Sequence, residues 1–221
     1  MTPTVSCTMM TAGRRAFIPK TIALFLAQTE PDCELVILDQ GSIPVAGLVP
    51  RHPRIVYRHE PARTLGAAQN RCCELCSAPV IVHWDDDDWH APTRVATQRA
   101  ALARANADIC GLAVIPFLSD EGSAAWDYRW EATAPWVFGA TFAYRRDLWD
   151  RHRFAEVPVG YDNLFVHGVT GARILPQGDD GWFVARVHGG NTSAKRTDGP
   201  HWYPRDPAPL LARVGARNGV W

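Results

Sequence analysis

The chain has 221 residues, of which 47% are hydrophobic and 21% are charged, a composition typical of a globular domain and unlike that of a disordered segment. Its 23 basic residues balance its 23 acidic ones, so the formal net charge is zero. This balance excludes binding to nucleic acid or to an anionic membrane through a field of one sign, so a local site must select any ligand.

The apolar stretches of the chain are short. Stretches such as residues 110–118 fall well below the ~20 residues that a membrane-spanning helix needs. No signal-peptide pattern is present at the N-terminus, because Pro3 and Thr4 lead directly into a strand-like segment. We therefore expect no transmembrane segment and a cytoplasmic protein, with its six cysteines reduced. Cys72, Cys73 and Cys76 are expected to be buried side chains and not a zinc site, because no second cysteine cluster accompanies them.

The first half of the chain alternates between strand and helix patterns. Strands are predicted at 5–9, 34–38, 55–57 and 80–84, and helices from Ile18, over 66–76 and over 93–106. Such alternation predicts an α/β fold with a mostly parallel central sheet and helices on both faces. Ligands bind such sheets beyond the carboxyl ends of the strands, where Asp39 and Asp85 are predicted to lie.

The second half has a different pattern. Strands are predicted at 110–117, 127–130, 136–144 and 182–188, with helices starting at Arg145 and near Asp162. The tail from Thr197 contains four prolines and is predicted to be a loop over the body or a lid. We expect one domain over 1–221, with a nucleotide-binding half at 1–107, an acceptor and catalytic half at 108–196, and the C-terminal loop at 197–221.

Four adjacent aspartates at residues 85–88, here called the acid run, follow the apolar strand predicted at 80–84. Their carboxylates repel one another, and a divalent cation would offset that repulsion. Mg²⁺ and Mn²⁺ prefer oxygen ligands and bind through carboxylates together with substrate phosphates. Side chains alternate along an extended chain, so Asp85 and Asp87 should point away from Asp86. A solvated acidic loop is the alternative interpretation.

These features together resemble a GT-A glycosyltransferase of family 2. The resemblance extends from Val5 to about Lys195 and rests on the first strand and loop at 5–14, the second strand and acidic turn at 34–42, Gly66, Asn70, and the acid run with Trp89 and Pro92. It implies a GT-A fold with a small antiparallel acceptor-side element. It also implies transfer of a sugar, with inversion, from a nucleotide-diphosphate sugar to an unidentified hydroxyl acceptor (a sugar, glycan, lipid or small molecule).

The resemblance also implies roles for individual residues. Asp162 would be the catalytic base, and Asp87 and His188 would ligate Mn²⁺ or Mg²⁺. The residues expected to bind the nucleotide are Thr11, Arg14, Asp39, Gly66, Asn70, Asp85 and Asp86. Two positions depart from the family pattern: Gln40 stands where a second Asp is common, and Tyr161 where Glu is common.

Elementary chemistry supports these roles and leaves alternatives open. A cation would stabilise the charge that develops on the leaving diphosphate, and a carboxylate would take the proton of the acceptor hydroxyl. A single base without a second nucleophile favours inversion. Asp162 is also a candidate helix N-cap, and His188 a candidate structural residue. The alternative functions are a nucleotidyltransferase and a non-catalytic nucleotide- or carbohydrate-binding protein of the same fold.

Overall fold

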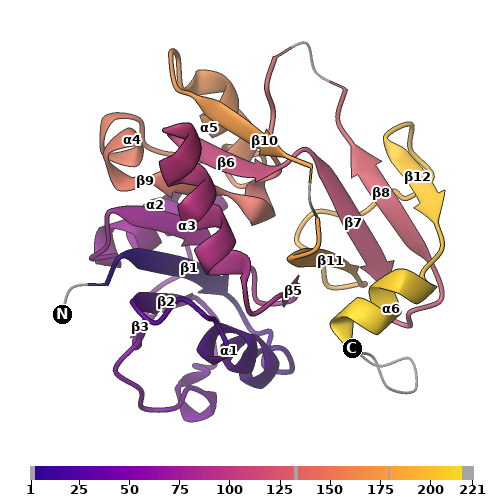
Figure 1. The fold of residues 1–221 in the computed structure, drawn as a ribbon. Helices are drawn as coiled ribbons and strands as arrows, with labels where there is room; N and C mark the ends of the chain where they lie inside the picture. Colours follow the sequence, from indigo (N-terminus) through magenta and orange to yellow (C-terminus); the bar gives the residue numbers. More distant parts are fainter. Residues whose placement is uncertain (1–2, 132–133, 179, 216–221) are drawn as a thin grey trace.

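The computed structural model of the chain describes residues 3–131, 134–178 and 180–215. Its main feature is a seven-stranded sheet in the order β10-β6-β9-β4-β1-β2-β3 (Figure 1). All neighbours pair in parallel except β9, which runs antiparallel to β4 and β6. The strands are β1 (Val5–Thr11), β2 (Cys33–Asp39), β3 (Ile55–His59), β4 (Val80–His83), β6 (Ile109–Leu112), β9 (Ala143–Arg145) and β10 (Ile174–Gln177). The predicted mostly parallel sheet is confirmed.

Helices cover both faces of this sheet, as predicted. Alternate side chains of β1, namely Val5, Cys7 and Met9, pack into one apolar cluster with α1 (Ile18–Leu26) and α3 (Arg94–Ala105). A second cluster on the other face holds side chains from α2 (Leu65–Leu75), α4 (Arg146–Arg151) and α5 (Tyr161–Gly168). All six cysteines are buried and free, which confirms that they serve as small core side chains. Within the described ranges, no helix is long and apolar enough to span a bilayer.

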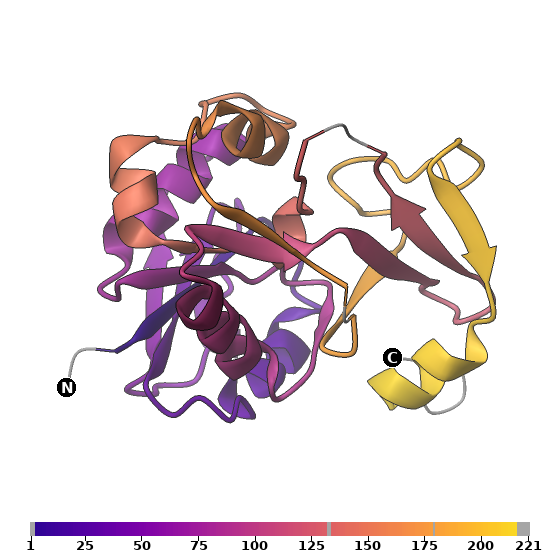
Figure 2. The ribbon, with the colours of Figure 1, turned by 45° about the horizontal axis from the view of Figure 1, so that its top comes forward.

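A second sheet lies beside the first, in the order β12-β8-β7-β11-β5 (Figure 2). Most of its pairs are antiparallel, and β11 runs parallel to β7. Its strands are β5 (Trp89–His90), β7 (Val114–Ser119), β8 (Ala125–Arg129), β11 (Phe183–Val187) and β12 (Trp202–Arg205). The acid run connects β4 of the first sheet to β5 of the second, so it lies where the two sheets meet.

Two strand predictions need correction. The single strand predicted at 110–117 is two strands, β6 and β7, which belong to different sheets and are separated by Ala113 alone. The strand predicted at 136–144 is largely irregular: a 3₁₀ turn, η2 (Gly139–Thr141), precedes the short β9. Thr141 stabilises that turn, because its hydroxyl donates to Phe138 O and accepts from the Leu112 amide.

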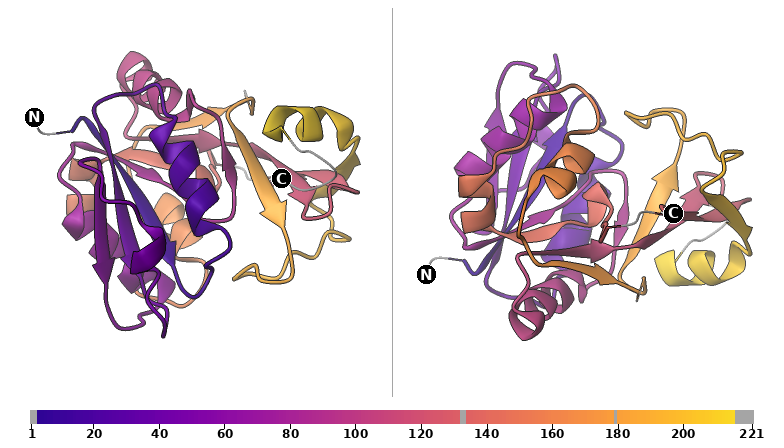
Figure 3. Two further views of the ribbon diagram at one scale, coloured as in Figure 1. Left: turned by 90° about the horizontal axis from the view of Figure 1, so that it is seen from below. Right: turned by 90° about the horizontal axis from the view of Figure 1, so that it is seen from above.

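The prediction that the C-terminal tail is a loop is also wrong for its described part. It forms β12 and helix α6 (Ala208–Val214), which lie on the side of the molecule opposite the N-terminus (Figure 3). Leu210 and Val214 pack against Leu118 and Val184 of the second sheet. The strand β12 escaped prediction because it contains Pro204, which is tolerated there since β12 is an edge strand. Residues 216–221 of the predicted loop lie outside the described residues.

Candidate active site

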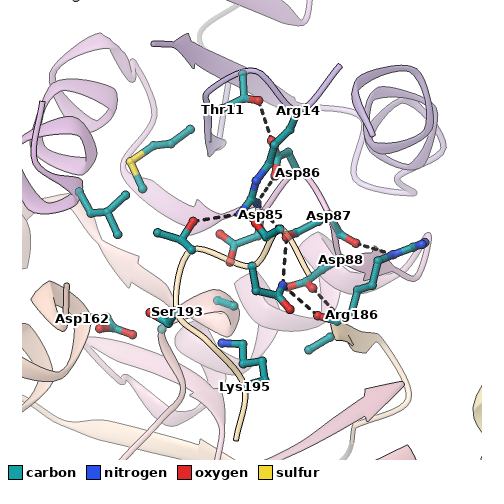
Figure 4. A pocket seen from close by; sticks show the side chains of 18 of the residues that line it. Thr11, Arg14, Asp85, Asp86, Asp87, Asp88, Asp162, Arg186, Ser193 and Lys195 are labelled. Carbon is teal, nitrogen blue, oxygen red and sulfur yellow. Dashed lines mark hydrogen bonds and ion pairs between the residues drawn. The ribbon is translucent and has the colours of Figure 1, made fainter. Parts of the chain in front are cut away.

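A cavity of about 400 Å³ lies beyond the carboxyl ends of β1 and β4 and takes its walls from both sheets (Figure 4). Ligands bind parallel α/β sheets at this edge. The lining comes from segments that are far apart in the chain: residues 10–12, Arg14, Gln40, Leu65, the acid run, Phe117, 138–140, 160–162, 185–186, 190–193 and Lys195. The fold thus brings the acid run and Asp162 to one cavity.

The acid run forms one wall. Oxygen atoms of Asp85, Asp87 and Asp88 all lie within 4.8 Å of one another, so these carboxylates converge. Asp86 instead accepts a hydrogen bond of 2.6 Å from the Thr11 hydroxyl at the end of β1. The buried strand β4 and the pairing of β5 with β11 hold the two ends of the run. Three converging carboxylates form an oxygen donor set suited to Mg²⁺ or Mn²⁺.

Arginines hold parts of the acid run in place. Arg14 Nη1 lies 2.8 Å from both Asp86 Oδ1 and Asp87 Oδ2, and its Nη2 donates to Gly190 O and the Thr192 hydroxyl, each at 2.9 Å. Arg186 donates from its amide to Asp88 Oδ1 at 2.9 Å and from Nε to Asp87 O at 3.1 Å. The loop at 190–192 is thereby tied to the acid run through Arg14.

The carboxylates of the acid run have perturbed acidities. Burial, together with the neighbouring carboxylates Asp87 and Asp86, raises the pKa of Asp85 to about 7. Burial and Asp87 likewise raise the pKa of Asp86, and burial with Asp87 and Asp85 raises the pKa of Asp88 well above its ordinary value. Negative charge is therefore costly in this wall, and a bound cation would favour the ionised carboxylates.

Asp162 lies in the first turn of α5 and lines another part of the cavity. The N-cap of that helix is Gly160, which has a φ of 78°, so the alternative role of Asp162 as N-cap is wrong. The Asp162 carboxylate packs directly on Gly139, where an added Cβ would lie 2.1 Å from Oδ2. Burial raises the pKa of Asp162, while the amides of Asn163 and Asp162 and the charge of Lys195 oppose that rise.

Four of the residues predicted for the site are not among the described residues that line the cavity. His188 lies next to it, with Nε2 2.9 Å from Asp87 Oδ2. The Asp39 carboxylate accepts hydrogen bonds from the Gly41 and Val45 amides and from the Tyr57 hydroxyl. Asn70 bonds to the Phe154 backbone and to the Trp149 indole, and Gly66 packs on the backbone of Ala155. Their predicted nucleotide and metal roles stay predictions.

Several cavity residues were missed from the sequence. Lys195 is one of only two lysines in the chain, and its Nζ lies 5.7 Å from the Phe117 ring centre and 6.0 Å from that of Phe138. Arg186 reaches the acid run from β11, across 98 residues of sequence from Asp88. Asp88 stood in the acid run but was not assigned a role. No local pattern distinguishes Lys195 or Arg186, since only the pairing of the second sheet brings them to the cavity.

Comparisons with known proteins agree with this architecture. The model of "Glycosyl transferase family 2" matches residues 6–158. No curated protein is similar enough to match. Among solved structures, the mannosyltransferase PcManGT from Pyrobaculum calidifontis, in complex with GDP-Man and Mn²⁺, has a TM-score of 0.68 at 18% identity over 87% of this chain and 59% of its own.

TarS from S. aureus is a second structural neighbour. It superposes with a TM-score of 0.67 at 15% identity over 85% of this chain and 37% of its own. TarS 1–349 in complex with UDP-GlcNAc superposes with a TM-score of 0.67 at 16% identity, over 87% of this chain and 60% of its own. The chain therefore spans less than two thirds of the length of these neighbours. Their likeness establishes the GT-A fold, and since the family model covers well over half of the sequence, the chain belongs to glycosyl transferase family 2.

Proposed function

We propose that this chain transfers a sugar from a nucleotide-diphosphate sugar to an acceptor hydroxyl, with a divalent cation and with inversion. One observation carries the proposal: in a chain of this family, three converging carboxylates and a separate half-buried carboxylate, Asp162, face one cavity. The structural neighbours support the donor class, since PcManGT was solved with GDP-Man and TarS with UDP-GlcNAc.

The donor end of the site is the acid run. Asp85, Asp87 and Asp88 would hold Mn²⁺ or Mg²⁺, with His188 beside Asp87 completing the site. The bound cation would stabilise the negative charge that develops on the diphosphate as its bond to the sugar breaks. Thr11 ends β1 and Arg14 follows three residues later, and both side chains donate hydrogen bonds to Asp86. At this place they would bind the nucleotide.

The acceptor end is centred on Asp162. Its carboxylate would accept the proton of the acceptor hydroxyl as that oxygen attacks the anomeric carbon, and its raised pKa makes it a better base than an exposed aspartate. Among the described residues that line the cavity, it is the only carboxylate outside the acid run. A single displacement without a covalent intermediate, and hence inversion, is the expected outcome.

The cation assignment is tested with Asp87→Ala. Removing this carboxylate should abolish Mn²⁺-dependent binding of a nucleotide sugar, measured by calorimetry against a panel of donors with Mn²⁺ and with a chelator. Asp150→Ala, on the exposed surface of α4, is the matched control and should bind as the wild type does. Mn²⁺-dependent affinity retained in Asp87→Ala would contradict the assignment.

The base assignment is tested with Asp162→Asn, which keeps the shape of the side chain. Donor affinity should stay unchanged, while transfer to the acceptor falls at least about 100-fold because the hydroxyl keeps its proton. Product formation is followed by chromatography, and the anomeric configuration of the product by NMR. Near-normal turnover would point to another base. Saturable nucleotide binding by the wild type, with neither transfer nor donor hydrolysis, would instead favour a non-catalytic binding protein.

A further inference from the structure

A buried arginine side chain lies near the acid run but does not line the cavity. Arg94, the first residue of α3, is 0% exposed, and its guanidinium has no carboxylate hydrogen-bond partner in the described part of the chain. Its nitrogens donate to His83 O at 2.7 Å, to Ala140 O at 2.9 Å, to Gln98 Oε1 at 3.1 Å and to His90 Nδ1. A buried arginine held by four acceptors has one orientation, because losing any of these bonds would leave a buried charge unsatisfied.

Arg94 determines the tautomer of His90. A guanidinium carries only donors, so His90 Nδ1 must be the acceptor and cannot carry a proton. The remaining proton of the neutral ring is then on Nε2, which lies 3.1 Å from Asp85 O. A carbonyl oxygen only accepts, so His90 donates to the Asp85 backbone. The ring is further held against Trp84, with the two ring centres 3.9 Å apart.

This hydrogen bond closes the loop that carries the acid run. Asp85 is the first residue of the run and His90 follows it within β5, five positions later. The Asp85 carboxylate makes no hydrogen bond of its own to the described residues, in contrast to Asp86 on Thr11 and Asp88 on the Arg186 amide. The direction of the Asp85 side chain is therefore set by its backbone, and that backbone is held by His90.

We propose that His90 is a positioning residue for the cation site: it relays the fixed orientation of Arg94 to the Asp85 backbone and so keeps the Asp85 carboxylate converging with Asp87 and Asp88. His90 is 0% exposed and does not line the cavity, so it acts through Asp85 and contacts no substrate. The inference rests on the proposed function in that it takes the acid run as the cation site.

The test compares His90→Gln with His90→Phe. The side-chain amide nitrogen of Gln reaches about as far as His90 Nε2, so His90→Gln keeps the N–H that donates to Asp85 O. Phe keeps an aromatic ring of similar shape but has no N–H to donate. Mn²⁺ affinity of the whole chain is measured by EPR titration without nucleotide. We expect His90→Phe to bind Mn²⁺ at least about tenfold more weakly than the wild type, the loss typical when the hydrogen-bond partner of a metal ligand is removed. We expect His90→Gln to bind Mn²⁺ nearly as tightly as the wild type, because it keeps that hydrogen bond. Melting curves of both variants check that each is folded.

Equal Mn²⁺ binding by folded His90→Phe and the wild type would overturn the inference, and so would equal weakening by the two variants. A wild type that binds no Mn²⁺ would instead refute the cation site of the proposed function. If His90→Phe does not fold, ¹⁵N NMR of the wild-type ring decides: a proton on Nε2 and none on Nδ1 is expected, and the opposite tautomer or a doubly protonated ring overturns the relay.

Discussion

His83 ends β4 and is separated from the acid run only by Trp84, and it illustrates how single buried residues set the chemistry near the cavity. The ring is 2% exposed, donates from Nδ1 to Gly139 O at 2.8 Å and accepts at Nε2 from the Tyr144 hydroxyl at 3.3 Å. Burial lowers the pKa of His83 from 6.5 to about 3, so the ring stays neutral in the folded protein. It thereby supports Gly139, on which the Asp162 carboxylate rests.

His83 contributes to the pH dependence of stability. In the unfolded chain His83 takes up a proton near pH 6.5, whereas in the folded chain it does so only near pH 3. Stability from the neutral ring is therefore complete above pH 6.5 and is lost as the pH falls toward 3, at about 1.4 kcal/mol per pH unit. In His83→Gln the free energy of unfolding should fall less steeply with decreasing pH, because one fewer proton is taken up on unfolding. Urea unfolding at a series of pH values measures this slope.

The exposed His167 on α5 provides the control for this measurement. His167→Gln should keep the wild-type slope, because it leaves the buried ring of His83 in place. The same slope in wild type and His83→Gln would show that His83 is not the group responsible.

At the scale of elements, the cavity depends on close contact between η2 and the start of α5. Gly139 in η2 has no side chain, and a Cβ there would lie within 2.7 Å of three atoms of Asp162. The residue pattern around 136–144 suggested a strand, yet a 3₁₀ turn forms because Thr141 bonds back to Phe138. The turn places Gly139 in contact with the carboxylate of the proposed base, Asp162, whereas an extended strand would not.

Gly139→Ala tests this contact. The new methyl group would displace the Asp162 carboxylate by an ångström or more, and a misplacement of about 1 Å costs roughly 100-fold in turnover. Donor affinity should change little, so the loss should appear in kcat measured with saturating donor. Gly47→Ala is the control, since a Cβ at Gly47 meets nothing within 4 Å. Unchanged turnover in Gly139→Ala would mean that Asp162 does not need its observed position.

At the scale of the whole molecule, the cavity exists because two sheets meet along one edge. The chain crosses from the first sheet to the second at the acid run and again at Ala113. After β9 and β10 of the first sheet it returns in β11, which pairs with both β7 and β5. This route carries Arg186 and the loop ending at Lys195 to the acid run. The described part of the C-terminal tail does not form a loose lid, because α6 packs its apolar side chains onto the second sheet.

Local sequence was sufficient for much of this molecule. The hydrophobic periodicity and the order of the segments are enough to predict the alternating strands and helices of the first half, because helices must cover a strand of apolar residues on both faces. They also place the acid run at the carboxyl end of a buried strand, where such sheets bind ligands. The resemblance to the family added Asp162, which the fold brings to the same cavity as the acid run.

Tertiary structure alone decided the rest. Residues 110–117 read as one strand because both faces are apolar, and only the packing of two sheets divides them at Ala113. Strands β10 and β12 each contain a proline, which local rules count against a strand but an edge position tolerates. The relay from Arg94 through His90 to Asp85 depends on hydrogen-bond partners that no residue pattern specifies. Sequence thus determined the elements and the acids, whereas long-range pairing determined which other side chains reach them.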